Sequence, residues 1–570
     1  MDTPLLSAPP LTGPSPADLF TPKLVTTLRE GYRISDLRAD IVAGLTVAIV
    51  ALPLSMAIAI ASGVTPERGL FTAAIGGFLI SALGGSRFQI GGPAAAFTVL
   101  VAGTVAKHGL DGLLLATMMA GVFLFLMGAL RLGSYIKFIP YPVTVGFISG
   151  IAVILFVGQV GDLLGLSLPG KEPADFLPKL EALWGALGTL NMAALAVSAG
   201  TVLVIVGLRR WRPSWPGILI AVVLGAAAAY FLKLPVDTIG TRFGGIPSSL
   251  PAPSLPAISV SKAVEVLPDA LSFALLGAIE SLLSAMVADG MTGRRHRSNM
   301  ELVAQGIANI GSALFGGICA TGTVARTATN VRAGARSPLA GMFHALFILL
   351  FMLIAAPLAS FIPLAGLAGV LAVVAWNMVE KAAFAALLRS SRGDAVTLLA
   401  TFLLTVFVGL TQAIVVGFSL GVLIFLHRMA QSAGVEAHLP PISEDVADDP
   451  TRPHYDPVMA TDPDVAVYRI TGAFFFGAAA TVGSVLDRVA DRHRAFIIDF
   501  SAVPFIDSTA ANTIEGVARK ARRLGVLLLV SGASEAVERM LRSHGVTDGF
   551  EGTIDQAVAV AHAAILNRTG

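Results

Sequence analysis

Long apolar runs occupy the chain from about Ile41 to Leu426, separated by short polar stretches. Most of them reach the roughly 20 residues that an α-helix needs to cross a bilayer. The pattern therefore predicts an α-helical polytopic membrane protein. Fourteen transmembrane segments are expected, at residues 40–61, 68–83, 93–106, 111–131, 136–158, 186–208, 214–233, 268–289, 301–316, 323–334, 337–357, 363–379, 391–409 and 411–429. Two of these, 93–106 and 323–334, are short and begin at glycine-rich sequence.

Basic residues are unevenly shared between the two sides of this predicted topology. The loops on the side of both termini carry Arg29, Arg33, Arg38, Arg87, Arg131, Lys137, Arg209, Arg210, Arg212, Arg294, Arg295, Arg297, Arg332, Arg336, Lys381, Arg389, Arg392 and Arg428. The opposite loops carry chiefly Lys171, Lys179, Lys233, Arg242 and Lys262. Because basic loops stay in the cytoplasm, both termini are predicted on the cytoplasmic side of the cell inner membrane.

Composition narrows the class of protein. Of the 570 residues, 55% are hydrophobic and 13% are charged, against about 25% charged residues in an average soluble protein. The formal net charge of +2 gives no indication of a nucleic-acid partner, and a single cysteine, Cys319, excludes a disulfide framework. No phosphate-binding loop motif is present, so primary pumping by this chain is not expected. Nothing indicates an enzyme, and no cofactor is expected.

The membrane part also repeats itself. Residues 81–85 (SALGG) precede 91–93 (GGP), and residues 312–317 (SALFGG) precede 321–323 (TGT). Each pair lies between the second and third segments of a set of seven, and an odd number gives the two sets opposite orientations. Interrupted segments at matching places in inverted halves indicate a transport site. The alternative is chance recurrence of glycine-rich turns in a chain with 59 glycines.

An inverted repeat would aim two half-helices at one point. They would begin at Ala94 and near Val324, and their free backbone N–H groups would attract an anion. Small residues let the substrate reach the backbone there: Ala94, Ala95, Ala96, Gly322 and Ala325. Thr323 opens the second half-helix, and Arg326 adds a full positive charge in its first turn. The alternatives for Arg326 are an ion-pair partner or a residue that extends to the interface.

Glu280 is an acidic residue well inside an apolar segment. An ionised carboxylate alone there is costly, so it must pair, bind a cation or take a proton. It could carry the coupling proton of a symporter, or bind Na⁺ together with Ser284, one helical turn later, and carbonyls near Thr321–Thr323. The alternative is a static salt bridge to Arg326. Asn377 and His344 are interpreted as packing or interface residues.

Beyond Arg428 the composition becomes that of a soluble domain. The expected organisation is a disordered N-terminus (1–38), a transport domain (39–429), a linker (430–463) and an α/β domain (464–562). Strands are predicted from alternation at 465–470 and from short apolar runs at 495–500 and 526–530.

The membrane part resembles the sulfate permease (SulP) family, solute carrier family 26. The match lies in residues 43–47 (AGLTV), 52–57 (LPLSMA), 91–93 (GGP), 280–283 (ESLL) and 321–330 (TGTVARTATN). The resemblance implies a 7+7 inverted repeat like that of the uracil permease. A core domain (segments 1–4 and 8–11) would move against a gate domain (segments 5–7 and 12–14).

The family's anion pocket falls here on Leu54 and Ile58 of the first segment and on Ala94, Ala325 and Arg326. Many members have Gln in place of Leu54, and some have Ser in place of Ala325, so this pocket is more apolar. Sodium–bicarbonate members carry Asp where Glu280 stands. The longer carboxylate favours proton coupling, with Na⁺ left open.

The C-terminal domain resembles STAS domains, related to anti-sigma-factor antagonists. Residues 472–477 (GAFFFG), 499–501 (DFS) and 506–510 (IDSTA) carry the match. In soluble relatives the serine after the second aspartate is phosphorylated, and that position is Ser508 here. A phosphate would add about −1.5 to −2 charge. The alternative is a helix N-cap at this Asp-Ser pair.

The resulting hypothesis is a secondary transporter that carries a small anion by alternating access, coupled to H⁺. It is expected to act as a homodimer, and its STAS domain is expected to regulate it or to bind a cytoplasmic partner. Alternatives are a Na⁺-coupled bicarbonate symporter, a passive anion channel, a nucleobase carrier and a membrane-tethered signalling scaffold. Dicarboxylate, bicarbonate, sulfate and chloride stay open as substrates, with a small carboxylate or bicarbonate favoured by the apolar pocket.

Overall fold

A computed structural model describes residues 19–134, 140–170, 173, 175–213, 215–431, 433–437, 464–489 and 493–569. Within them the chain forms two compact units, Met1–Phe418 and Ser419–Gly570. Residues 1–18, which were expected to be disordered, lie outside the described residues. Residues 438–463, most of the expected linker, also lie outside them. So do Lys137 and Lys171, two of the basic residues used above to orient the chain.

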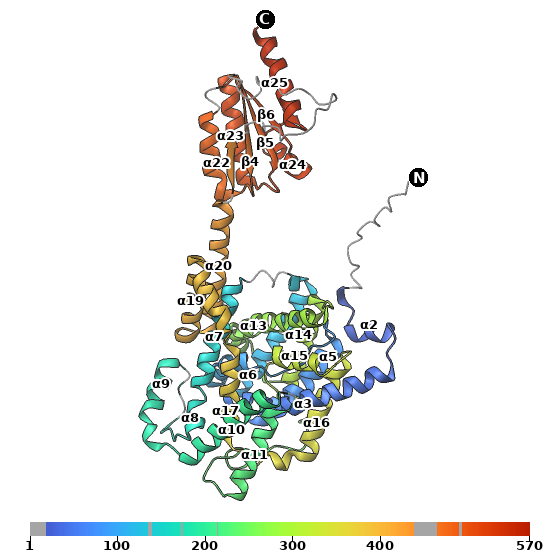
Figure 1. Ribbon diagram of the computed structural model, residues 1–570, viewed down its shortest axis with the longest axis vertical. Helices are drawn as coiled ribbons and strands as arrows, with labels where there is room; N and C mark the ends of the chain where they lie inside the picture. Colours follow the sequence, from blue (N-terminus) through green and yellow to red (C-terminus); the bar gives the residue numbers. More distant parts are fainter. Residues whose placement is uncertain are drawn as a thin grey trace. The chain divides into compact units, whose positions relative to one another are not determined.

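The first unit is almost entirely helical (Figure 1). Its elements are α2 (Lys23–Arg29), α3 (Ile34–Ala61), α4 (Pro66–Phe71), α5 (Gly77–Leu83), β1 (Gly91–Gly92), α6 (Thr98–Ala129), α7 (Tyr141–Val157), α8 (Val160–Leu164), α9 (Phe176–Gly185), α10 (Met192–Trp211), α11 (Gly217–Phe231), α12 (Ile239–Phe243), α13 (Val260–Thr292), α14 (Ser298–Leu314), β2 (Thr321–Gly322), α15 (Val324–Arg332), α16 (Leu339–Ala359), α17 (Leu364–Met378), α18 (Lys381–Ser390), α19 (Arg392–Phe407) and α20 (Leu410–Gln431).

Eight helices in the described part of the chain are long and apolar enough to cross a bilayer. They are Ile34–Ala61, Ala95–Ala129, Tyr141–Leu164, Met192–Trp211, Val260–Thr292, Leu339–Ala359, Leu364–Ser390 and Leu410–Gln431. The other expected segments form shorter helices, such as α5, α11 and α15. The count of fourteen crossings stays a prediction, while the multi-pass helical membrane fold is confirmed.

The expected disorder through residue 38 is wrong for two stretches, because α2 is helical and α3 already begins at Ile34. Tertiary contacts explain the order of α2. The Lys23 backbone N–H donates to the Gly84 carbonyl over 2.9 Å, and the Arg297 guanidinium donates to the Thr21 carbonyl over 2.8 Å. The local sequence gave no sign of these contacts, because their partners lie far along the chain.

The second unit contains a five-stranded sheet with helices on both faces (Figure 1). The strand order is β3 (Gly434–Ala437), β4 (Val465–Thr471), β5 (Ala495–Ala502), β6 (Leu527–Ser531) and β7 (Phe550–Glu551). Strands β4 to β7 run parallel, and β3 pairs antiparallel with β4. The three predicted strands are therefore confirmed. Strand β3 falls inside the expected linker, where the sequence did not predict it.

Alternation along β5 explains how the sheet is covered. Phe496, Ile498 and Phe500 pack with α22 (Phe476–Val489), α23 (Ser508–Leu524) and α24 (Glu535–Ser543) on one face. Ala495 and Ile497 pack with α25 (Ile554–Thr569) on the other. Successive side chains of a strand point to opposite faces, so an unbroken apolar run is required where both faces are buried.

Candidate anion site

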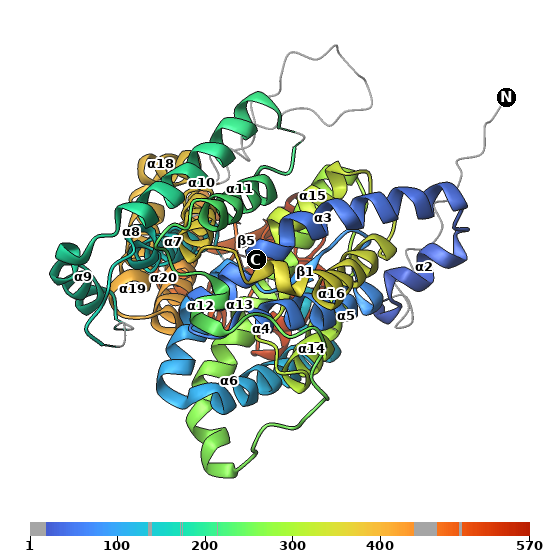
Figure 2. The ribbon, with the colours of Figure 1, turned by 90° about the horizontal axis from the view of Figure 1, so that it is seen from below.

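The two interrupted segments of the membrane part meet inside the helical unit. Strands β1 and β2 pair antiparallel, with Gly91 opposite Gly322 and Gly92 opposite Thr321. The Thr323 backbone N–H continues the ladder by donating to the Ile90 carbonyl over 3.0 Å. Figure 2 shows β1 in the middle of this unit, with α3, α15 and α16 around it. The two half-helices therefore begin side by side.

Each half-helix starts directly after its strand. The first begins with a 3₁₀ turn at Ala95–Phe97 and runs into α6, which is interrupted at Gly109. The second is α15, only nine residues long. Neither N-cap residue, Ala94 or Thr323, makes a side-chain capping bond. The first N–H groups of both half-helices are therefore left for a ligand or water.

A cavity of about 440 Å³ lies at these helix starts. All eight residues expected to bind substrate line it: Leu54, Ile58, Ala94, Ala95, Thr323, Val324, Ala325 and Arg326. Leu54 and Ile58 come from α3, while the others come from the two half-helix starts. The structure thus gathers residues that lie far apart in sequence around one space, with an almost wholly apolar wall.

Arg326 is the cationic side chain among the described residues that line this cavity. It is 2% exposed. Its Nη2 donates to the Ser55 hydroxyl over 3.1 Å, whereas Nε and Nη1 have no protein partner. A buried guanidinium with free donors is costly unless a ligand or water satisfies it.

Glu280 of α13 lines the same cavity. Its Oε2 is buried without a hydrogen-bond partner. No ion pair joins Glu280 to Arg326 in the described part of the chain, so the alternative of a static salt bridge is not what the structure shows. The carboxyl group and the guanidinium stand as separate polar groups in an apolar chamber.

Two residues expected to complete a coupling-ion site do not line the cavity. The Ser284 hydroxyl donates to Thr327 Oγ1 over 2.9 Å, and the Thr321 hydroxyl donates to the Gly277 carbonyl over 3.2 Å. Thr327 Oγ1 also accepts from the Ile90 N–H over 3.1 Å. Helical spacing put Ser284 near Glu280, but packing of α15 against α13 turns its hydroxyl to Thr327.

Sequence reasoning missed the opposite wall of the cavity. It is formed by Thr144, Phe147 and Ile148 of α7, Ile218 of α11, Val374, Asn377 and Met378 of α17, Glu380, and Ile414 of α20. Asn377, interpreted as a packing residue, lines the cavity and accepts from Arg209 Nη1 over 2.8 Å. His344 is fully buried on α16 and does not line the cavity. Asn377 and Glu380, polar at the end of an apolar run, were the available signal.

In the second unit, Ser508 is the first residue of α23 and is exposed. The N-cap is Asp507, whose carboxylate accepts from the Ala510 N–H over 2.8 Å and from the Phe476 N–H over 2.9 Å. The capping role at the Asp-Ser pair therefore belongs to Asp507. Phosphorylation of Ser508 stays a prediction.

Asp499 lies within β5 and is 1% exposed. It accepts from Arg469 Nε over 2.6 Å, the Ser501 hydroxyl over 2.7 Å and the Ser531 hydroxyl over 3.2 Å. Burial alone would raise the pKa of Asp499, but the hydrogen bonds from Ser501 and Arg469 outweigh it and hold the pKa below its ordinary value. This aspartate ties β4, β5 and β6 together.

A multi-pass helical unit with two paired half-helices at an apolar cavity, followed by an α/β domain, defines a class of membrane transporter. Residues 37–401 match the model of the sulfate permease family, and residues 456–561 match the STAS domain. The chain belongs to the sulfate permease family. It is an anion transporter and not an enzyme.

Named relatives and solved structures resemble nearly the whole chain. The "Putative sulfate transporter YvdB" of Bacillus subtilis (strain 168) is 39% identical over 91% of this chain and 95% of its own. The bicarbonate transporter BicA of Picosynechococcus sp. is 32% identical over 89% of this chain and 90% of its own. The structure of murine Slc26a9, an anion transporter, superposes with a TM-score of 0.85 at 17% identity, covering 98% of this chain and 97% of that one.

Proposed function

We propose that the protein is a secondary transporter that carries a small monoanion, bicarbonate or a small carboxylate, together with H⁺ by alternating access. The observation that carries this proposal is that an anion-binding group and a proton-accepting group line the same cavity. Arg326 offers free donors to an anion, and Glu280 offers a carboxyl group without a protein partner to a proton.

The side chains of the cavity wall favour a substrate with a single negative charge. Desolvation of an ion grows steeply with its charge, and an apolar cavity repays it only through fixed charges and aligned donors. Among the described residues that line the cavity, one side chain is cationic and two, Glu280 and Glu380, are acidic. Sulfate carries two charges, so any ionised Glu280 or Glu380 at the cavity wall would repel it more strongly than it repels a monoanion.

The coupling of anion transport to H⁺ follows from the same balance of charges in the cavity. An ionised Glu280 without a partner is costly in an apolar chamber, so a proton that arrives with the anion keeps the loaded site close to neutral. Na⁺ coupling would need oxygen ligands beside Glu280, and Ser284 and Thr321, the expected hydroxyl ligands, do not line the cavity. We place the transporter in the cell inner membrane with both termini cytoplasmic, as a homodimer regulated by its STAS domain.

Uptake into liposomes by the purified full-length protein tests the proposal. Labelled bicarbonate, acetate, succinate and sulfate are offered under imposed pH or Na⁺ gradients. Saturable, pH-driven uptake of the monoanions is expected, and gradient-independent flux would instead indicate a channel. Glu280→Gln should abolish gradient-driven accumulation, and Arg326→Ala should abolish uptake. Glu265→Gln on α13 and Arg332→Ala on α15 are matched controls, because both residues are exposed and neither lines the cavity.

A further inference from the structure

The segment before and at the start of α3, residues 21–40, makes polar contacts that the transport site does not use; we refer to it as the N-terminal strap. Its first contact is with the loop 84–87. The Lys23 N–H donates to the Gly84 carbonyl over 2.9 Å, and Arg87 Nη2 donates to both Glu30 oxygens over 2.5 and 2.6 Å. That hydrogen bond from Arg87 holds the pKa of Glu30 below its ordinary value, so the pair is ionised at neutral pH.

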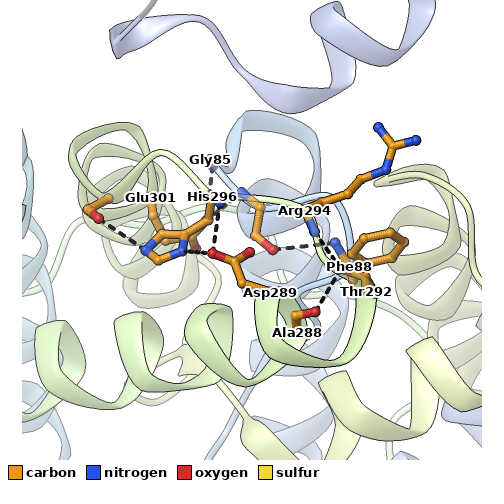
Figure 3. Close-up of polar contacts among 10 residues, drawn as sticks. Gly85, Phe88, Ala288, Asp289, Thr292, Arg294, His296 and Glu301 are labelled. Carbon is orange, nitrogen blue, oxygen red and sulfur yellow. Dashed lines mark hydrogen bonds and ion pairs between the residues drawn. The ribbon is translucent and has the colours of Figure 1, made fainter.

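The second contact of the strap is with the loop 293–297. Arg297 Nη1 donates to the Thr21 carbonyl and to the Thr26 hydroxyl, each over 2.8 Å. Arg294 lies 3.8 Å from Glu30. This loop is fixed to the end of α13, because the His296 ring lies 2.7 Å from Asp289 Oδ2 (Figure 3).

The third contact is with the loop 335–337. The Tyr32 hydroxyl donates to Asp40 Oδ2 over 2.7 Å. Asp40, fully buried, accepts in turn from the Arg336 N–H over 2.6 Å and the Ser337 N–H over 3.1 Å. The strap is therefore bonded to three separate loops of the helical unit.

These three loops adjoin the elements that form the anion cavity. Loop 84–87 leads through β1 to Ala94, loop 293–297 follows the helix that carries Glu280, and loop 335–337 follows the half-helix that carries Arg326. Glu301 fixes the first loop further, accepting from the Gly85 N–H over 2.9 Å and the Ser86 N–H over 3.1 Å (Figure 3). Loops 84–87 and 335–337 connect to the half-helices, so a shift of either loop is passed to its half-helix, whereas loop 293–297 adjoins α13.

We propose that the N-terminal strap positions both half-helices of the anion cavity from outside it, with Glu30 and Tyr32 as positioning residues that act through Arg87 and Asp40. Aligned N–H groups bind an anion only where their geometry is held, so the strap sets anion affinity. Any agent that engages residues 21–40 would then alter transport without entering the cavity.

Hydrogen exchange of the full-length protein tests the positioning directly and does not depend on transport. Glu30→Gln removes the ion pair, and Tyr32→Phe removes the hydroxyl donated to Asp40. Faster exchange is expected at the two half-helix starts, residues 91–98 and 321–327, in both variants. Glu67→Gln on α4 and Tyr230→Phe on α11 are controls, because within the described residues Glu67 bonds to Thr65 and the Tyr230 ring packs on Phe231 and Phe361, all outside the three loops. Exchange at wild-type rates in both strap variants overturns the proposal.

Initial rates of labelled bicarbonate uptake in liposomes separate positioning from plain stabilisation; this arm rests on the proposed function. Both strap variants should raise the KM at least threefold while kcat changes less than twofold. A lowered unfolding temperature with the KM unchanged overturns the positioning role. Absence of uptake by the wild-type protein, with accelerated exchange in the variants, would refute the proposed function and leave the strap supported.

Discussion

Arg326 fits beside the ribbon of β1 and β2 because Gly92 has no side chain. A Cβ atom at Gly92 would lie 2.3 Å from Arg326 Nη1, far inside van der Waals contact. Gly92 also has a φ of +154°, which residues with a side chain rarely adopt. The orientation of the Arg326 side chain in the cavity therefore depends on Gly92, although Gly92 has no functional group of its own.

Gly92→Ala should weaken anion binding by about 1.5–3 kcal/mol, the range for losing a hydrogen bond to a charged group, because Arg326 must move away. The expected readout is a rise of fivefold or more in the KM of bicarbonate uptake. Gly103→Ala is the matched control, since nothing lies within 4 Å of a Cβ atom there. Equal KM values for the two variants would contradict this account of Arg326.

The residues that sequence could identify are those whose chemistry conflicts with their surroundings. Glu280 and Arg326 stand out as charges within apolar or small-residue sequence, and both line the cavity. Ser284 and Thr321 do not line the cavity, because the direction of a hydroxyl is decided by a neighbouring element, here Thr327 and Gly277. Leu54 and Ile58 carry no chemical signal and came from the family resemblance alone.

At the scale of elements, α22 and α23 of the second unit are joined at their N-termini by Asp507. Its two oxygens accept from the Ala510 and Phe476 N–H groups, the latter at the first residue of α22. One carboxylate thus satisfies orphan donors of two helices and complements both helix dipoles.

Asp507→Ala should destabilise the second unit by about 1–2 kcal/mol, the upper range for a lost N-cap, because two helix starts lose their acceptor. Ser508→Ala should change stability by less than about 0.5 kcal/mol, as expected for an exposed side chain. Hydrogen exchange of residues 508–524 in the full-length protein measures both. A larger effect for Ser508→Ala than for Asp507→Ala would show that Ser508, and not Asp507, is the N-cap.

The strap offers an element-scale prediction about pH. Burial raises the pKa of Tyr32, and the neighbouring Asp40 raises it further. Because the pKa of Tyr32 is higher in the folded protein than the ordinary tyrosine value near 10, the neutral phenol stabilises the fold fully at any pH below 10. This stabilisation is lost only when the pH rises through the higher pKa of the folded protein. The unfolding temperatures of the wild type and Tyr32→Phe should therefore differ by the same amount at pH 6 and pH 9. A difference that shrinks by pH 9 would show that the phenol ionises earlier than its buried bond allows.

Across the whole molecule, apolar periodicity predicted the membrane unit and the α/β domain, and it separated residues 93–106 from residues 111–131. The structure agrees, because the non-helical backbone at Gly109 divides α6 into two helical parts. Strand β3, by contrast, was not predicted, because a four-residue edge strand gains its stability from β4 rather than from its own sequence. The inverted pairing of Gly91 with Gly322 was predictable only because the two glycine-rich motifs repeat.

Charge asymmetry predicts the orientation of the whole molecule, and the single cysteine makes that prediction easy to test. Cys319 is fully buried, so the wild-type protein should not react with a membrane-impermeant maleimide. Ser35→Cys and Ala257→Cys place an exposed thiol in the basic N-terminal region and in a loop of the opposite side.

In intact cells the reagent should label Ala257→Cys and spare Ser35→Cys, because the arginine-rich loops are retained in the cytoplasm during insertion. Permeabilised cells should show labelling of both. Labelling of Ser35→Cys in intact cells would reverse the topology. It would also move the N-terminal strap to the outer surface, where cytoplasmic factors could not reach it.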